Sequence, residues 1–527
     1  MRRFAKAILG LGLVLALGLA AAPATAQTPR KGGTLRILVH PEPPHVVTAL
    51  GQASGTVTIG GKIFEGLLTF DFGLNPKPGL AERWERSADG LTYTFHLRRN
   101  AKWHDGKPFT AADVVFTTQE FLMKTHPRAR SVFSRVASVE TPDDHTVVYK
   151  LKERFSPFLY AFELSGAPMM PKHIYAGTEF DKNPANAKPV GTGPFRFVSW
   201  TRGESLQLER NPDYYREGRP YLDAISFHFI PDAAARTVAL EQGLVDQAQF
   251  DAVQFTDLER LKKNPALTIA DKGQEFIAPL ILMDMNSRRP PFGDKRFRKA
   301  LLHSIDRNFI KDRIFYGQGK VPTGPISSST RYYISDVPRY DYDPEKAKAL
   351  LDEMGLKPGA DGTRAEIKIL ALPYGDHWTR LGEYLRESFR RVGVRATVEN
   401  TDPGNWIQRY TNWDYDIVYT FFYQYADPAL GVARTYLCSN VRKVFLANAN
   451  GYCNQRIDDL FSAATSETDE AKKQAAYDEI QKTLIEDLPT APLLELQFPV
   501  VLNRRVHDAI TTAHGPNDAY ADAWLAR

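Results

Sequence analysis

The sequence predicts a fold in which β-strands and α-helices alternate along the chain, of the α/β or α+β class. Short runs rich in β-branched and aromatic residues have the composition of strands. The clearest of these runs are 34–39, 91–98, 145–151, 204–210, 224–230, 366–372 and 414–422. Segments with helical periodicity lie between them, and the sequence contains no internal repeat and no low-complexity linker.

The best-defined predicted helix covers residues 343–355. Asp343 stands at the N-cap position, Pro344 at the first helical position and Gly355 at the exit, which is the expected distribution of these residue types at helix ends. Two further segments are predicted to be helical, residues 296–315 and 470–488.

The N-terminus has the pattern of a secretory signal peptide. Three basic residues precede an apolar run from residue 7 to 22, and Ala24-Thr25-Ala26 is a small-residue cleavage site. Residues 1–26 are therefore predicted to be removed, with cleavage near Ala26-Gln27. The alternative is an N-terminal membrane anchor, but the apolar run is shorter than the roughly 20 residues that a spanning helix needs.

Removal of this signal peptide lowers the formal net charge of +5 by three basic residues, to +2. A chain so close to neutrality gives no sign of the concentrated basic face that nucleic-acid binding requires. The mature chain of about 500 residues is too long for one hydrophobic core, so two or three domains are expected.

The two cysteines of the chain, Cys438 and Cys453, are predicted to form a disulfide bond. An exported protein folds in an oxidising compartment, where a single pair of cysteines is best explained in this way. A metal site is the weaker alternative, because no histidine stands at ligand spacing from either cysteine.

His104 and Asp105 raise the question of catalysis, because they are adjacent titratable residues. Asp105-Gly106 is a turn signal after the strand 91–98, and Thr110 with Asp113 forms a capping box for the following helix. The pair is therefore interpreted as part of a tight turn, since a catalytic relay also needs a third, nucleophilic member.

Seven blocks in a fixed order resemble the extracytoplasmic solute-binding proteins of the peptide/nickel class, family 5, which serve bacterial ABC importers. The signature block is GLAERWERSADGLTYTFHLRRNAKWHDGKPFTAADVVFT at 79–117. The others lie at 64–71, 189–215, 235–246, 286–310, 342–355 and 425–460. The resemblance spans essentially the whole mature chain.

This resemblance implies an α/β fold of the type II periplasmic binding protein class, with two lobes around a ligand cleft and an extra smaller domain. The implied boundaries are a signal peptide at 1–26, domain I at 27–66, 192–279 and 498–527, domain II at 67–191, and domain III at 280–497. Two crossovers join domains I and III, and the cleft between them closes by a hinge motion.

The resemblance also implies a function. The chain is expected to be a periplasmic monomer that captures a small organic solute and delivers it to the permease subunits of an ABC importer, without catalysis, cofactor or bound metal. A peptide or modified amino-acid derivative is the favoured ligand. An opine, an oligosaccharide or a metal chelate remains an alternative within the same fold.

Gln424 departs from the family pattern. In peptide-binding members an aspartate often pairs with the amino terminus of the ligand, four residues before the proline of an acidic-Pro dipeptide. That dipeptide is Asp427-Pro428 here, and the position four before Pro428 is Gln424. A neutral amide lacks the charge-assisted bond of a carboxylate. We therefore expect weak binding of unmodified di- and tripeptides, unless another acid such as Asp427 serves.

The remaining candidate ligand-binding residues come from three segments. Tyr and Trp suit a buried organic ligand because each combines a flat apolar face with a polar tip, although aromatics of this kind also fill protein cores. With Gln424 and Asp427, the predicted contacts are Tyr423, Tyr425, Trp406, His45, Gln52 and Ser54. The loop 40–55 also holds His40 and Glu42, but a proline-broken loop offers no defined metal geometry.

The rival from another class is a secreted hydrolase. The sequence contains neither G-x-S-x-G nor H-E-x-x-H, and a disulfide would leave no free cysteine nucleophile. The resemblance likewise points to binding rather than turnover.

Overall fold

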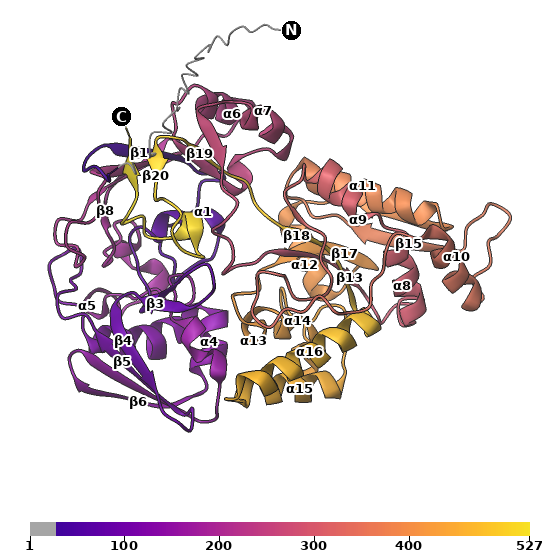
Figure 1. Ribbon diagram of the computed structural model, residues 1–527, viewed down its shortest axis with the longest axis horizontal. Helices are drawn as coiled ribbons and strands as arrows, with labels where there is room; N and C mark the ends of the chain where they lie inside the picture. Colours follow the sequence, from indigo (N-terminus) through magenta and orange to yellow (C-terminus); the bar gives the residue numbers. More distant parts are fainter. Residues whose placement is uncertain (1–27, 527) are drawn as a thin grey trace, which may run out of the picture.

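The computed structural model describes residues 28–526, so the predicted signal peptide lies outside the described part of the chain. The chain forms two lobes (Figure 1), which are built on three sheets of four or more strands. The first lobe contains the chain from β1 (Thr34–Leu38) to β12 (Leu267–Ile269) and receives the C-terminal residues from β19 (Val500–Asn503) onward, and the second lobe is formed by the segment from β13 (Leu280–Met285) to β18 (Thr490–Leu496).

The first lobe contains a seven-stranded sheet in the order β12-β19-β11-β1-β10-β9-β8. Its members come from distant parts of the chain: Leu267–Ile269 (β12), Val500–Asn503 (β19), Gln247–Gln249 (β11), Thr34–Leu38 (β1), Ala224–His228 (β10), Ser205–Arg210 (β9) and Phe195–Thr201 (β8). This sheet corresponds to domain I. Helices Ser54–Gly60 (α1), Ala233–Glu241 (α6) and Leu258–Lys262 (α7) accompany it.

Domain II also lies in the first lobe and has a four-stranded antiparallel sheet, in the order β4-β5-β7-β6. Its strands are Ala81–Arg86 (β4), Thr92–Leu97 (β5), Thr146–Leu151 (β7) and Val136–Asp143 (β6), with helices Ala111–Phe116 (α2) and Pro127–Phe133 (α4). Thr110 and Asp113 form the predicted capping box, in which the backbone N–H of Thr110 donates to Asp113 Oδ2 at 3.0 Å.

The second lobe, domain III, has a six-stranded mixed sheet in the order β14-β18-β13-β17-β15-β16. The strands are Gly319–Lys320 (β14), Thr490–Leu496 (β18), Leu280–Met285 (β13), Ile417–Phe422 (β17), Ala365–Leu370 (β15) and Val394–Glu399 (β16). Its helices include Asp376–Arg390 (α11), Pro403–Asn412 (α12), Pro428–Gly431 (α13), Ala433–Tyr436 (α14), Gln455–Ser466 (α15) and Glu470–Asp487 (α16).

The three predicted helical regions have different outcomes. Helix Pro344–Glu353 (α10) begins after Asp343, whose carboxylate accepts from Lys346 N at 2.9 Å, and α16 covers the segment predicted at 470–488. The region 296–315 is not continuous: Lys295–His303 (α8) ends, and Arg307–Phe309 (α9) starts anew. The carboxylate of Asp306 causes the restart, because it caps the N–H groups of the new first turn.

The chain passes between the lobes twice, before β13 and after β18, which are neighbouring antiparallel strands. The side chain of Gln274 joins the two passes. Its Nε2 donates to Phe498 O at 2.6 Å, and its Oε1 accepts from Phe498 N at 3.0 Å. The two connecting segments are thus held to one another by a pair of hydrogen bonds.

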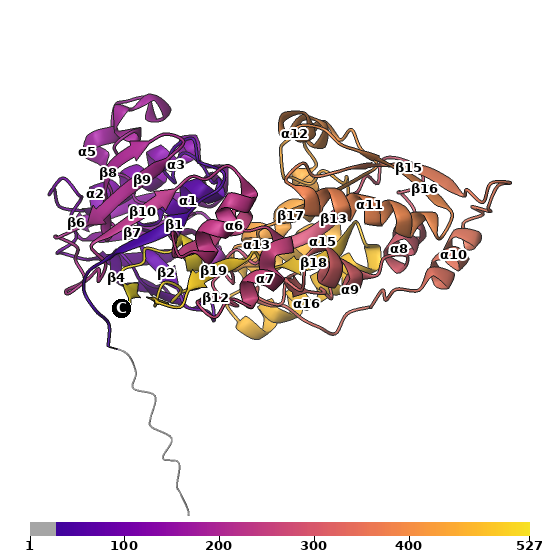
Figure 2. The same cartoon turned by 90° about the horizontal axis from the view of Figure 1, so that it is seen from above.

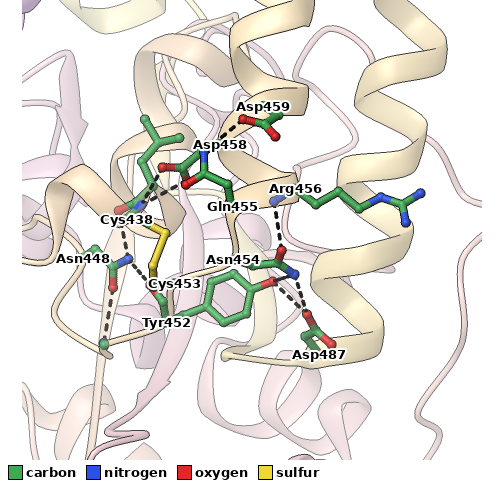
Figure 3. The surroundings of a disulfide bond; sticks show 12 residues. Cys438, Asn448, Tyr452, Cys453, Asn454, Gln455, Arg456, Asp458, Asp459 and Asp487 are labelled. Carbon is green, nitrogen blue, oxygen red and sulfur yellow. Dashed lines mark hydrogen bonds between the residues drawn. A yellow bond between two sulfur atoms is a disulfide. The ribbon is translucent and has the colours of Figure 1, made fainter.

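The predicted disulfide between Cys438 and Cys453 is confirmed (Figure 3). The backbone N–H of Cys438 donates to Asp458 Oδ1 at 3.0 Å, so the bridge is fixed against α15. The loop that it closes is also held by Asn448, whose Nδ2 donates to Tyr452 O at 2.7 Å.

His104 and Asp105 contact different partners. The Nδ1 of His104 accepts from Gly191 N at 3.2 Å while its Nε2 lies 2.9 Å from Gly193 O, and Asp105 binds His173 at 2.6 Å. Burial lowers the pKa of His104 to about 4, so its ring is neutral at pH 7 and donates from Nε2. His104 therefore fastens the turn at 191–193, Asp105 contacts His173 instead, and the two residues form no relay.

Within the described residues, no helix combines the length and apolar character needed to cross a membrane.

Candidate functional site

A cavity of about 590 Å³ lies between the two lobes, where α1 and α6 of the first lobe face the second (Figure 2). Domain I contributes Gln52, Ser54 and Phe250, and domain III contributes Tyr374, His377, Phe421 and Tyr423. Phe498, on the second crossover, also lines it. Its size and mostly apolar wall suit a small organic ligand.

The aromatic wall is fixed by stacking within domain III. The ring of Phe421, at the end of β17, lies 5.7 Å from Trp378 in a stacked arrangement, and it contacts Tyr423 at 5.6 Å and Phe498 at 5.3 Å. Such aromatic contacts orient each ring before any ligand arrives. The wall is consequently a preformed surface rather than one assembled by the solute.

The polar edge of the cavity comes from loops. Gln52 is held by a hydrogen bond from its Nε2 to Thr48 O at 2.8 Å, and Ser54 is the first residue of α1. On the opposite side, burial lowers the pKa of His377 to about 4, so the imidazole is neutral at pH 7. His377 Nε2 is buried and has no hydrogen-bond partner among the described residues.

Three of the predicted ligand contacts therefore line this cavity: Gln52, Ser54 and Tyr423. His45 does not line it. That residue lies in a separate groove of about 880 Å³ on the first lobe, together with Lys124 and Arg202. Contact with a ligand stays a prediction for each of them.

Gln424 is buried inside domain III, and its amide is fully engaged there. Its Oε1 accepts from Ser327 N at 2.8 Å and from Thr330 Oγ1 at 2.9 Å, while its Nε2 donates to Pro325 O at 3.0 Å. The side chain that replaces the aspartate of the family pattern thus acts as a structural link between two loops.

Asp427 and Trp406 are also buried in domain III. The Asp427 carboxylate caps α13 by accepting from Ala429 N at 3.0 Å, and it accepts from the Tyr477 hydroxyl at 3.3 Å. Trp406 stacks on Tyr410, with ring centroids 5.4 Å apart. Neither residue lies on the wall of the interlobe cavity.

Tyr425 lies where domain III meets domain II. Its ring packs against the hydrophobic cores of both lobes, and the guanidinium of Arg128 from α4 lies 3.8 Å from the ring centroid. A second contact between the same domains joins Arg331 to the Tyr160 hydroxyl. Domain II, which belongs to the first lobe, therefore also contacts the second lobe.

Several cavity residues were not among the sequence-based candidates, notably Phe250, Tyr374, His377 and Phe498. Tyr374 lies in the loop between β15 and α11, and His377 lies in the first turn of α11. The carboxyl end of a parallel strand is a recognised position for binding residues. Phe250 and Phe498 carry no such signal. Among the described residues, no three His, Cys, Asp or Glu side chains are placed to hold a metal ion.

Comparison with known proteins agrees with a ligand site between two lobes, because the matches are solute-binding proteins. The sequence profile of the bacterial extracellular solute-binding proteins, family 5 Middle, matches residues 75–443. The oligopeptide-binding protein AppA of Bacillus subtilis is 29% identical over 521 residues, covering 93% of this chain and 92% of AppA.

Two solved structures show how closely the fold is shared. AppA in complex with a nonapeptide superposes with a TM-score of 0.79 at 26% identity, over 95% of this chain and 100% of AppA. AgaA of A. tumefaciens R10 in complex with agropinic acid gives 0.77 at 25% identity, over 94% of this chain and 99% of AgaA.

Two lobes around an aromatic cavity define the chain as a solute receptor with the type II periplasmic binding protein fold. It belongs to the bacterial extracellular solute-binding proteins of family 5, which serve ABC importers. The recognition, fold class and general function expected from the sequence are thereby confirmed. The boundaries of the domains stay a prediction.

Proposed function

We propose that this protein captures peptides in the periplasm and delivers them to the permease of an ABC importer. The observation that carries the proposal is the preformed aromatic cavity of about 590 Å³ between the lobes, with Tyr423 on one side and Gln52 and Ser54 on the other. The relative AppA, which binds a nonapeptide, supports a peptide as the ligand.

The proposed mechanism is binding, closure and release without a covalent step. Closing the lobes removes water from the cavity and strengthens the polar contacts within it. The closed monomer then docks on the permease subunits through both lobes. The turn at His104 and Asp105 supports this view, because both residues are engaged in structural hydrogen bonds.

We further propose that unmodified di- and tripeptides are poor ligands. The amide of Gln424 is hydrogen-bonded to Ser327, Thr330 and Pro325 inside domain III. The carboxylate of Asp427 accepts hydrogen bonds from Ala429 and Tyr477. A ligand ammonium group would have to displace one of these bonds to reach them. Peptides with a blocked amino terminus avoid this cost, because they carry no ammonium group.

The test combines two measurements on the mature protein. Native mass spectrometry of protein purified from the periplasm identifies the solutes that co-purify, and calorimetry measures the affinity of di- and tripeptides with free and with acetylated amino termini. We expect peptide masses in the first measurement and weaker binding of the free peptides than of the acetylated ones in the second. Submicromolar affinity for a common dipeptide would refute the weak binding of unmodified peptides, and co-purification of non-peptide solutes alone would refute the peptide class.

A small organic acid is the second candidate ligand. AgaA, bound to agropinic acid, shares the fold over 94% of this chain. The same mass spectrometry distinguishes the two candidates by the masses of the released solutes.

A further inference from the structure

Four aromatic rings form a row along the wall of the interlobe cavity, and all four line it: Phe250, Phe498, Phe421 and Tyr423. The ring centroids of Phe250 and Phe498 lie 5.3 Å apart, and those of Phe498 and Phe421 also lie 5.3 Å apart. Tyr423 follows at 5.6 Å from Phe421. This aromatic row therefore runs from domain I, across the second crossover, into domain III.

The backbone of Phe250 is strained. Its φ is 53°, in the left-handed region where a bulky side chain crowds the backbone. Its N–H donates to Pro499 O at 3.1 Å, so the strained residue is fixed to the segment that follows Phe498. Strained conformations of this kind persist where the surrounding structure enforces them, and they cluster at functional sites. The strain at Phe250 supports a binding role for the row into which it places its ring.

The two members from domain III are the accessible part of the row. Phe421 and Tyr423 are partly exposed, whereas Phe250 and Phe498 are buried. The buried pair supports the row, and the exposed faces of Phe421 and Tyr423 are the surface that a solute covers. Removal of this apolar surface from water favours binding, and a flat aromatic group also gains from stacking on it.

The polar side chains around the row are uncharged among the lining residues whose side chains the structure describes. They are Gln52, Ser54, Gln254, Tyr374, His40 and His377. Burial lowers the pKa of both histidines below the usual 6.5, so their rings are neutral at pH 7. A charged group placed against these side chains would lose hydration without gaining an ionic partner from them. An uncharged group has no such cost.

We propose that the aromatic row receives an uncharged aromatic or large aliphatic group of the solute, and that the receptor selects solutes that carry one. In a peptide this group is an aromatic side chain or a side chain of the size of leucine. The inference rests on the proposed function in one respect: the solute must bind between the lobes. It goes further because it names the chemical group that the cavity recognises and the side chains that recognise it.

The experiment uses the mature protein and three variants, Phe421→Gln, Phe421→Leu and the control Phe309→Gln. Phe309 is also a stacked aromatic residue of domain III, with its ring 4.6 Å from that of Tyr384, but it is 43% exposed and lies outside the cavity. The probes are acetylated tripeptides that carry phenylalanine, leucine, glutamine, glutamate or lysine at one position and glycine at the other two. Each of the three positions is tested, and calorimetry measures the affinities.

For at least one position, we expect the wild type and Phe309→Gln to bind the phenylalanine and leucine peptides at least about tenfold more tightly than the other three. Phe421→Gln should reduce this ratio to less than about threefold, because an amide replaces the ring on which the group stacks. Phe421→Leu should keep the preference for leucine and lose part of that for phenylalanine, because it is apolar without a flat face.

Equal affinity of the wild type for the phenylalanine and glutamine peptides at every position would overturn the proposal. An unchanged ratio in Phe421→Gln would overturn it as well. The comparison of peptides on the wild type decides even if a variant folds poorly.

A second measurement separates this inference from the proposed function. The wild type is incubated with a cell extract that contains peptides and other small molecules, and the retained solutes are identified by mass spectrometry. Retained non-peptides that carry an uncharged aromatic or aliphatic group would refute the peptide class while supporting the role of the aromatic row. Peptides that bind without preference at any position would do the reverse. A wild type that binds neither a tripeptide nor any solute of the extract would contradict both.

Discussion

The side chain of Gln424 accepts a hydrogen bond of 2.8 Å from the backbone N–H of Ser327. Because it bonds to Thr330 and Pro325 as well, it connects the loop after β17 to the segment 325–330. We expect Gln424→Ala to lower the free energy of unfolding by about 1–3 kcal/mol, since buried partners are left unsatisfied. Urea unfolding measures this change. The exposed Gln408→Ala should stay within about 0.5 kcal/mol, and equal effects of the two variants would contradict the assignment.

The disulfide should stabilise domain III through the loop that it closes. With a sequence separation of 15 between Cys438 and Cys453, the chain-entropy relation gives about 3 kcal/mol. The double variant Cys438→Ser/Cys453→Ser should therefore unfold at lower urea concentration than the wild type. A reductant should lower the midpoint of the wild type by the same amount and leave the variant unaffected; a midpoint shift in the variant would show another cause.

Tyr423 should contribute to ligand affinity because it lines the interlobe cavity. We expect Tyr423→Ala to weaken binding of the co-purifying solute at least about tenfold, equivalent to roughly 1.4 kcal/mol. Calorimetry measures the change. Tyr342→Ala is the matched control, because Tyr342 is 42% exposed and lies outside this cavity. An unchanged affinity in Tyr423→Ala would remove this residue from the site.

Asp284 should make stability depend on pH. Burial raises its pKa to about 7. It accepts from Tyr410 and Asn450, and no cationic side chain among residues 28–526 pairs with it. Because the folded pKa exceeds the unfolded value of about 3.8, the folded state binds more protons between these values and stability falls as pH rises from about 4 to 7.

Asp284→Asn imitates the protonated acid and should remove this loss. At pH 8 we expect the variant to be more stable than the wild type by about 4 kcal/mol, which is the free-energy equivalent of the pKa difference, and the gap should close toward pH 4. Thermal unfolding at several pH values tests this. The fully exposed Asp336→Asn should behave as the wild type; a flat difference for Asp284→Asn would contradict the prediction.

Several helix ends could be predicted because the residues that determine them are close neighbours in the sequence. The capping box at Thr110 and the capped helix after Asp343 depend on residues within one helical turn. The region 296–315 was only partly predictable, since the restart at Asp306 competes with an otherwise continuous helical pattern. The two lobes came from the family resemblance rather than from periodicity.

The site was less predictable because its residues meet only through tertiary structure. Gln52, Phe250 and Tyr374 come from three distant segments, and no local pattern joins them. An aromatic side chain gives the same sequence signal on a cavity wall as in a core, as Tyr423 and Trp406 illustrate. The orientation of Gln424 depends on the segment 325–330, so its internal hydrogen bonds could not be read from its neighbours.

The bonds between Gln274 and Phe498 restrict how the receptor can move. Two connecting segments without contact to each other would let one lobe twist and slide against the other. Two segments joined by hydrogen bonds must bend together, as one hinge. Opening then exposes the same two walls in the same register each time, so every solute meets an identical entrance. Removal of these two hydrogen bonds would make the direction of the hinge motion less defined before it altered either wall of the cavity.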